Sequence, residues 1–345
     1  MYVVRRFCRS TFKRDGGKLD DIDIRDQQVF LIDAILKHKN EYTESFLKEK
    51  GLPHTYKKSI LRSKLKEGLD DNDFTELELI KLLDRIEEFG NQHIYLYNCT
   101  PEYCDTLKRP DYIQNILDDS DLGGLYNKEF GVIVPERPML CSVIHNEKTL
   151  KFKWIEKRVW RELIDKTIED DKYIETYQMH VSRGITTFRI DLVLGYSELM
   201  IQRLPRGTKY EDIKDTYIDK LSNFIEIGPF SKVGLGRAIK NIEASHEVEK
   251  RQINLESTAG GKVTFKSKKK GSDYNEDPHL NSARTALAQN VSGISGNFYW
   301  MPNDILRRDI HTHIYAKDDR VGIFKECDEN EVNYVLSRIR HFASQ

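Results

Sequence analysis

The first third of the chain is patterned for helices. Between residues 22 and 92 apolar side chains recur every three or four positions, which is the period of an amphipathic helix. We expect helices over residues 43–50, 55–69 and 75–90. The third has a well-defined start, because Thr75 is followed three residues later by Glu78, the spacing of a capping box. Gly90 suits the C-terminal end of that helix.

From residue 93 onward polar and apolar residues alternate in short runs, which is typical of strands. We expect strands over residues 93–97, 132–134, 139–144, 150–155, 173–181, 185–194, 198–204, 298–301, 312–316 and 321–325. We expect helices over residues 210–224, 237–254 and 283–291, and a last one from about residue 328. The connections at 182–184 and 195–197 are too short for a parallel crossover, so they predict antiparallel hairpins.

These elements predict an α+β fold: a small helical N-terminal domain plus a mainly antiparallel β-sheet domain flanked by helices. The boundaries follow from changes in period and composition. They give a basic N-terminal segment over 1–21, a helical domain over 22–92, an α+β domain over 93–256, a mobile basic and acidic loop over 257–281, and C-terminal strands and a helix over 282–345 that complete the α+β domain. Within 257–281, a hairpin tip around 262–265 is the alternative to a loop.

Composition limits the classes of partner. The chain has 345 residues, with 55 Lys and Arg against 56 Asp and Glu, so the net charge of -1 supplies no field over the whole molecule. Any binding to nucleic acid must therefore use local patches. No run of about 18 apolar residues occurs, so we expect no membrane-spanning helix. The five cysteines form no C-x-x-C pair, which favours free thiols in a reducing cytoplasm over a disulfide scaffold or a zinc site. No cofactor is expected.

One segment combines a break between helices with concentrated positive charge. Phe46-Leu47 precedes Gly51-Leu52-Pro53, and Leu61 and Leu65 follow. The cations of this segment are Lys57, Lys58, Arg62, Lys64 and Lys66. Residues 43–69 resemble a SAP-type helix–extended–helix DNA-binding module. The resemblance implies that the two helices pack through the apolar positions, and that the basic start of the second helix contacts the DNA backbone.

The physics of a helix N-terminus agrees with that resemblance, because unpaired amides and the positive end of the helix dipole attract phosphate. Such contacts are independent of base sequence and sensitive to salt. A second basic run, formed by Lys266, Lys268, Lys269 and Lys270, is expected to assist. The alternatives are a structural helical bundle that mediates protein contacts and, for the second run, a solvated loop tip.

A nuclease is the enzymatic alternative. Asp191 lies on a predicted strand and Glu198 on the next, so both carboxylates could face one cleft and hold a divalent ion. The Glu-x-Lys pattern of restriction-type nucleases is missing, however, because Leu199 and Met200 follow Glu198. The alternative interpretation is the polar face of an antiparallel strand.

Two weaker patterns complete the candidates. Alternation places Asp309, His311 and His313 on one strand face, where they either bind a metal or form a polar outer surface. Trp154 and Trp160 are interleaved with Lys151, Lys153, Lys157, Arg158 and Arg161, so they either stack on nucleic acid or belong to the core.

The prediction that combines these observations is a non-enzymatic DNA-binding or adaptor subunit of a larger complex, which contacts the phosphate backbone without sequence specificity. We expect protein partners or a homo-oligomer and no membrane association. The alternatives are a metal-dependent nuclease and a protein-interaction subunit of a defence or genome-maintenance complex.

Overall fold

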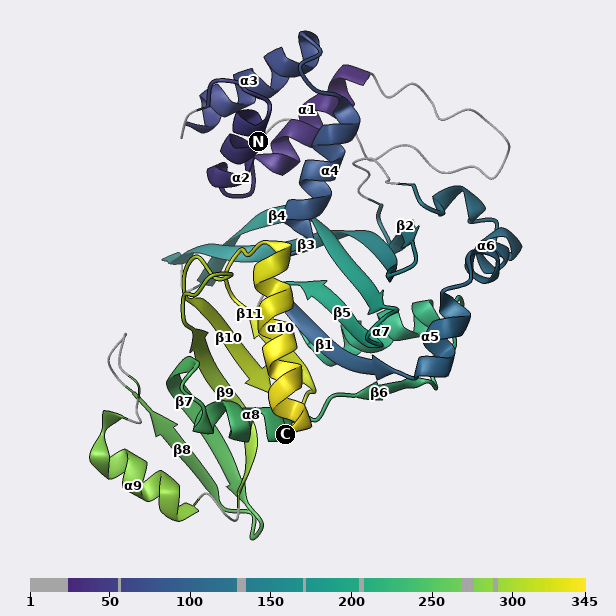
Figure 1. The fold of residues 1–345 in the computed structure, drawn as a ribbon. Coiled ribbons are helices and arrows are strands. Elements are labelled where there is room, and N and C mark those ends of the chain that lie inside the picture. Colours follow the sequence, from purple (N-terminus) through teal and green to yellow (C-terminus); the bar gives the residue numbers. More distant parts are fainter. Residues whose placement is uncertain are drawn as a thin grey trace.

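The fold is α+β, as the sequence predicted, with helices flanking one large antiparallel sheet (Figure 1). The computed structural model describes residues 24–54, 57–128, 135–169, 172–204, 208–267, 273, 276–287 and 291–345. The basic segment 1–21, the strand expected at 132–134, and Lys268, Lys269 and Lys270 lie outside the described residues.

Four helices precede the sheet and share a core of their own. They are α1 (Ile24–Ile35), α2 (Asn40–Glu49), α3 (Lys58–Asp70) and α4 (Glu76–Glu87). Leu31, Leu47, Leu61, Leu65 and Leu79 meet at the centre of this bundle with no exposed surface. The capping box predicted at the start of α4 is confirmed, since the Thr75 and Glu78 side chains each accept the other's backbone N–H.

The sheet has eleven strands in the described part of the chain, and every strand pair is antiparallel. The strands are β1 (Gln92–Cys99), β2 (Met139–His145), β3 (Thr149–Glu169), β4 (Lys172–Asp191), β5 (Tyr196–Gln202), β6 (Phe230–Lys232), β7 (Val248–Ser257), β8 (Lys262–Lys266), β9 (Val291–Trp300), β10 (Ile310–Tyr315) and β11 (Arg320–Ile323). Their order is β2-β3-β4-β5-β1-β11-β10-β9-β7-β8, with β6 beside β1. The central strand β1 therefore joins the N-terminal and C-terminal halves of the sheet.

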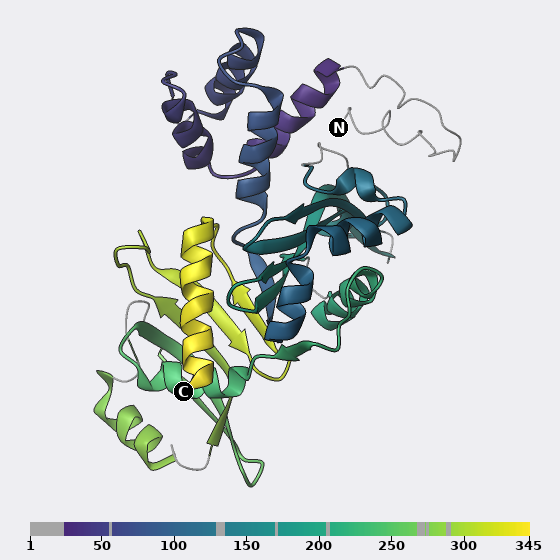
Figure 2. The ribbon, with the colours of Figure 1, turned by 45° about the vertical axis from the view of Figure 1, so that its right-hand side comes forward.

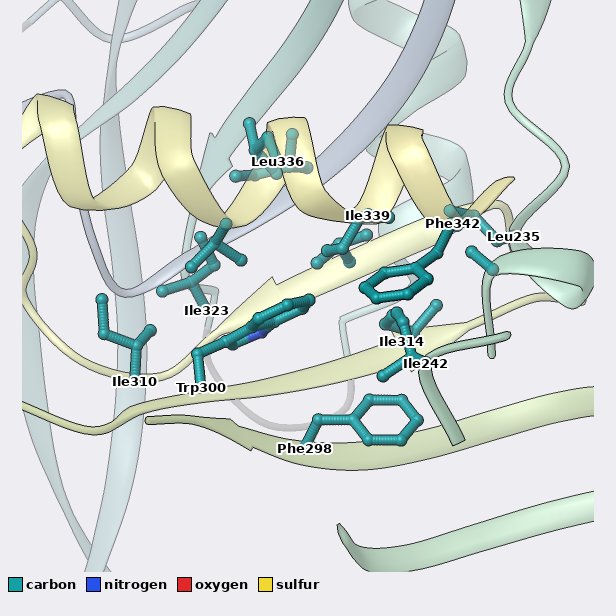
Figure 3. Packing of buried hydrophobic residues seen from close by; sticks show 14 of the residues in the cluster. Leu235, Ile242, Phe298, Trp300, Ile310, Ile314, Ile323, Leu336, Ile339 and Phe342 are labelled. Atoms are coloured by element: carbon teal, nitrogen blue, oxygen red, sulfur yellow. The ribbon is translucent and has the colours of Figure 1, made fainter. Parts of the chain in front are cut away.

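Helices cover different faces of the two halves. On the face that we call the front, α8 (Leu235–Ala244) and α10 (Glu329–Ser344) pack on β1 and β9–β11 around Trp300, Phe298 and Ile339 (Figures 1 and 3). α9 (Pro278–Leu287) adds Leu280 to the same cluster. On the back face, α5 (Pro101–Leu107), α6 (Pro110–Asp119) and α7 (Tyr210–Ser222) pack on β1–β5, and a short 3-10 turn, η1 (Gly123–Leu125), follows α6. No helix in the described ranges is long and apolar enough to cross a bilayer.

β3 and β4 form a hairpin that is much longer than predicted. The sequence analysis placed a turn at residues 182–184, but β4 runs unbroken from Lys172 to Asp191. Gly184 serves the packing and not a turn, because a Cβ atom there would lie 2.0 Å from the Arg158 Nε atom. Beyond this point the hairpin leaves the rest of the sheet, and we call residues 159–181 the arm.

The helix expected over 237–254 is wrong beyond Ala244. Residues 248–257 form strand β7, because the segment pairs with β8 on one side and β9 on the other. The segment 257–281, for which loop and hairpin were both open, contains β8 and the start of α9.

Candidate nucleic-acid interface

The segment with the SAP-like pattern contains two helices, α2 and α3, and residues 55 and 56 between them lie outside the described residues. α2 ends beside Gly51, whose φ of 71° is left-handed, and the N–H of Leu52 returns to the Leu47 carbonyl at 2.9 Å. α3 starts at Lys58, with Lys57 as an extended N-cap that provides no side-chain cap. Within the described ranges no side chain caps the first turn of α3, so its leading amides suit an outside acceptor.

Three of the five predicted cations in α3 are already engaged within the bundle. Lys58 donates to the Leu36 carbonyl at 2.7 Å, Arg62 pairs with Asp33, and Lys64 pairs with Glu67 at 2.6 Å. Lys57 and Lys66 are exposed and have no side-chain partner among the described residues. The positive charge available to phosphate at α3 is therefore smaller than the sequence suggests.

The two predicted basic groups do not meet. Lys266 is the last, exposed residue of β8, and β8 and α3 lie at opposite ends of the molecule (Figures 1 and 2). A single phosphate site built from α3 and Lys266 is therefore excluded by the arrangement of the elements.

The two carboxylates of the nuclease alternative line one cavity of about 570 Å³ between α4, α10 and the front face of β3–β5. Both are engaged in structural contacts there. Asp191 accepts the backbone N–H groups of Val193 and Leu194 at 2.9 and 2.8 Å, which fixes the β4–β5 turn. Glu198 is buried between Arg189 and Arg340. Nowhere in the described ranges do three or more His, Cys, Asp or Glu side chains form a group that could hold a metal.

The basic and aromatic pattern around Trp154 is split between the two faces of the sheet. Trp154 lies in the core behind the sheet, 1% exposed. Lys151 and Lys153 face forward, where they pair with Glu88 of the loop after α4 and, for Lys153, also with Asp84 of α4. Burial alone would lower the pKa of Lys153, yet the nearby carboxylates of Glu88 and Asp84 outweigh it and raise that pKa. These lysines attach the bundle to the sheet and are not available to nucleic acid.

A surface that the sequence analysis did not assemble lies on the back face of the C-terminal half. We call it the ring platform, and it consists of Tyr299, His311, His313, Tyr315 and Phe324. Alternation along β9 and β10 turns these side chains away from the core, since their neighbours Phe298, Trp300, Ile310, Thr312 and Ile314 are buried. α8 and α10 cover the opposite, front face.

Four rings of the platform form two stacked pairs, and Phe324 is tilted by 41° from His311. Tyr299 and His311 lie 4.5 Å apart with planes 7° from parallel, and His313 and Tyr315 lie 3.9 Å apart at 10°. The centres of the Phe324 and His311 rings lie 5.1 Å apart. Tyr299, His311 and Phe324 therefore form a row that runs across β9, β10 and the end of β11. All five residues keep part of their surface accessible.

Gly322 makes room for this arrangement. It lies between His93 of β1 and His313 of β10 in the sheet register. A Cβ atom at this position would come within 2.8 Å of the Phe324 ring and 3.2 Å of the His93 ring. Any larger residue would therefore displace the rings.

The cations beside the platform are arginines and not imidazoles, and two of them are paired: Arg320 with Asp318 at 3.0 Å and Arg251 with Glu249 at 3.4 Å. The guanidinium carbon of Arg320 lies 4.1 Å from the centre of the Tyr315 ring, and those of Arg203 and Arg251 lie 5.8 and 5.9 Å from Phe324 and Tyr299. Burial, together with nearby His311 and Arg320, lowers the pKa of His313 to about 4. The histidines are thus neutral at pH 7 and serve as flat rings beside permanent cations.

The metal alternative at Asp309, His311 and His313 is not supported. Asp309 binds Lys325 at 2.7 Å, whereas both histidines stack on tyrosines. The alternation that placed His311 and His313 on one face was real. The sequence lacked the register that adds Tyr299 and Phe324 beside them.

No family model matches this chain, and no curated protein matches it. The proposals below therefore rest on the geometry of the chain itself.

Proposed function

We propose that the protein is a non-enzymatic nucleic-acid-binding subunit, and that single-stranded segments lie across the ring platform. The observation that carries this proposal is the row of adjacent rings, in which Tyr299 stacks on His311 and Phe324 is tilted by 41° from His311, with arginines beside it. Aromatic faces stack on any base, and arginines bind the backbone, so this surface suits binding without sequence specificity.

The spacing of the rings supports the same conclusion. Neighbouring strands lie about 4.8 Å apart, and the ring centres of Tyr299, His311 and Phe324 repeat at 4.5 and 5.1 Å. A flexible single strand can follow that spacing, whereas a duplex keeps its bases stacked inside. Single strands are therefore the expected form.

α3 has a secondary role in this proposal. Its uncapped first turn carries Lys57 and open amides, which suit a phosphate of the same or a second strand. This contact adds salt-dependent affinity and no base preference.

An adaptor role is the second candidate function, and the arm favours it. Val159, Met179 and Val181 share one face of the arm and are 50%, 62% and 42% exposed. An exposed apolar surface on a protruding hairpin is typical of a contact with another protein.

The test of nucleic-acid binding is fluorescence anisotropy with a labelled 20-nucleotide poly-dT strand and a matched duplex. We expect the wild type to prefer the single strand, and Tyr299→Ala to weaken binding roughly tenfold. Tyr173→Ala, which removes an exposed tyrosine of the arm, is the matched control and should bind as the wild type does. Lys57→Glu should reduce the salt dependence while leaving the preference for single strands intact. Equal affinity of the wild type and Tyr299→Ala would remove the ring platform from the proposal.

A further inference from the structure

A second cavity, of about 490 Å³, lies under α1 at the point where β5 ends and β4 continues into the arm. We call it the α1 cavity. It is lined by Lys37 and His38, which follow α1, and by Arg158, Arg183 and Arg203 from the sheet and its edge. Its volume is in the range of sites that hold small ligands.

Arg183 is the central observation. Its side chain is 6% exposed, and its Nη2 atom is 3.5 Å from the Glu87 carboxylate. Its Nε and Nη1 atoms are buried and have no hydrogen-bond partner within the described ranges. Buried N–H groups of a charged side chain without acceptors are rare in folded proteins. They mark a place where an acceptor from outside the chain fits.

The charge of the cavity is suited to an anion. Four cations, Lys37, Arg158, Arg183 and Arg203, line it against two carboxylates. One of these carboxylates, Glu87, is almost fully buried, and burial raises its pKa, although nearby Arg183 and Lys153 oppose that shift.

Arg158 differs from Arg183 because its guanidinium is already held. It donates to Glu156 at 2.8 Å, to the Gln202 carbonyl at 3.0 Å and to the Ile185 carbonyl at 3.5 Å. Arg158 is therefore a fixed wall of the cavity. Arg183 also lines the cavity, and two of its buried donors have no partner among the described residues, whereas Arg203 is an exposed cation of the lining.

Two further residues of the cavity lining indicate which other groups the ligand carries. Trp160 lines the cavity, and its indole, which stacks on His180 at 5.3 Å with planes 15° apart, suits contact with a flat group. Glu326 also lines the cavity, and its Oε2 atom is buried without a hydrogen-bond partner in the described part of the chain. A carboxylate oxygen in that position suits a hydroxyl donor.

From these contacts we infer that the α1 cavity binds a phosphorylated ligand of nucleotide size. Arg183 and Arg203 would hold the phosphate, Glu326 a hydroxyl and Trp160 the flat ring. A charge-assisted hydrogen bond to a phosphate oxygen suits either of the two donors of Arg183 that lack a partner among the described residues. Arg203 also borders the ring platform, where its guanidinium carbon lies 5.8 Å from the Phe324 ring, whereas Arg183, Trp160 and Glu326 line the cavity alone.

The test uses the full chain and isothermal titration calorimetry with three probes: adenosine 5′-monophosphate, adenosine and inorganic phosphate. We expect the monophosphate to bind most tightly, phosphate more weakly, and adenosine weakest. Tryptophan fluorescence gives a second readout, because Trp154 and Trp300 are each 1% exposed and only Trp160 of the three tryptophans is accessible. The monophosphate should protect Trp160 from quenching by iodide.

Arg183→Gln and Arg203→Gln should each weaken binding of the monophosphate about tenfold. Arg203 is exposed, so its variant keeps the proposal testable if Arg183→Gln does not fold. Arg109→Gln, on the exposed N-terminus of α6, is the matched control and should bind as the wild type does.

The inference is overturned if adenosine binds as tightly as its monophosphate, if both cavity variants bind like the wild type, or if neither phosphate probe gives heat or protects Trp160. Loss of poly-dT binding in Tyr299→Ala has no bearing on these outcomes. Because Arg203 borders both sites, Arg183→Gln in the cavity and Tyr299→Ala on the platform are the variants that separate the two proposals.

Discussion

Arg340 of α10 and Glu198 of β5 form an ion pair of 3.1 Å, and their side chains are only 4% and 6% exposed. Arg340 also donates to the carbonyls of Tyr97 and Ser197 at 2.9 and 2.8 Å. One guanidinium thereby fastens the C-terminal helix to two neighbouring strands, β1 and β5. Glu198, which the sequence predicted as a possible metal ligand, is therefore the counter-ion of Arg340.

We predict that Glu198→Ala lowers the free energy of unfolding by about 3–5 kcal/mol, because it leaves the Arg340 charge buried without its partner. Glu329→Ala removes the exposed partner of Arg189 and should cost less than about 1 kcal/mol. Urea denaturation followed by circular dichroism measures both. Similar losses for the two variants would contradict a structural role for Glu198.

We expect no cleavage when supercoiled plasmid is incubated with the protein and Mg²⁺ or Mn²⁺, because the Asp191 and Glu198 carboxylates are engaged within the fold. Agarose gel electrophoresis is the measurement. Nicking by the wild type that disappears in Asp191→Ala would instead support the nuclease alternative.

Stability should fall as the pH drops below neutral, and His93 should contribute. Burial, with Arg320 and Arg203 nearby, lowers the pKa of His93 to about 3, whereas an unfolded histidine titrates near about 6.5. Between these values the unfolded chain binds one more proton, so the free energy of unfolding falls by up to about 1.4 kcal/mol per pH unit.

His93→Gln should reduce that pH dependence, since it retains an acceptor for Arg320 and cannot titrate. Denaturant titrations at pH 7.5, 6 and 5 measure the slope. His246→Gln, at an exposed site, is the control and should keep the wild-type slope. A wild-type slope in His93→Gln would show that His93 is not neutral in the folded state.

Gly90 and Gly51 both have left-handed φ angles, of 88° and 71°, but only Gly90 is crowded. A Cβ atom on Gly90 would lie 2.5 Å from the backbone N of Cys327, whereas one on Gly51 would meet nothing within 4 Å. We predict that Gly51→Ala costs about 1–2 kcal/mol and Gly90→Ala roughly 3 kcal/mol or more. Thermal and urea unfolding compare them, and equal costs would argue against the close contact between the bundle and the 325–327 segment.

The arm is expected to be dispensable for folding. No described residue between Val159 and Val181 belongs to a buried cluster. Replacing this stretch with Asn-Gly, a turn that joins Arg158 to Ser182, should change the free energy of unfolding by less than about 1 kcal/mol. Size-exclusion chromatography and urea titration test this. A large loss would mean that the arm stabilises the sheet.

Local signals in the sequence predicted most elements of the fold. The α+β class followed from two hydrophobic periods, and the start of α4 followed from the spacing of Thr75 and Glu78. Contacts between distant residues could not be predicted in this way. Gly184 was interpreted as part of a turn, whereas a glycine is needed there because the Arg158 side chain of the neighbouring strand packs against it.

The same limit applies to the sites. The lysines and the arginine of α3 predicted a basic surface, but the charge of Arg62 is neutralised by Asp33, which lies 29 residues earlier in the sequence. The ring platform needs the register of β9, β10 and the residue after β11, and the α1 cavity needs the meeting of α1 with the arm. Neither the strand register nor the contact between α1 and the arm can be predicted from the charge pattern and the hydrophobic period of the sequence.

The position of β1 has a consequence for how the chain is made. β1 begins at Gln92 and pairs with β5 on one edge and with β6 and β11 on the other, but β11 begins only at Arg320. During synthesis, the Gln92–Tyr95 part of that edge therefore stays unpaired for more than two hundred residues, whereas β6 can pair with Tyr97–Cys99 earlier. Until β11 has been synthesised, the nascent chain exposes an unpaired strand edge that can pair with another chain. Termination of synthesis before β11 should therefore yield aggregates and not a smaller soluble product.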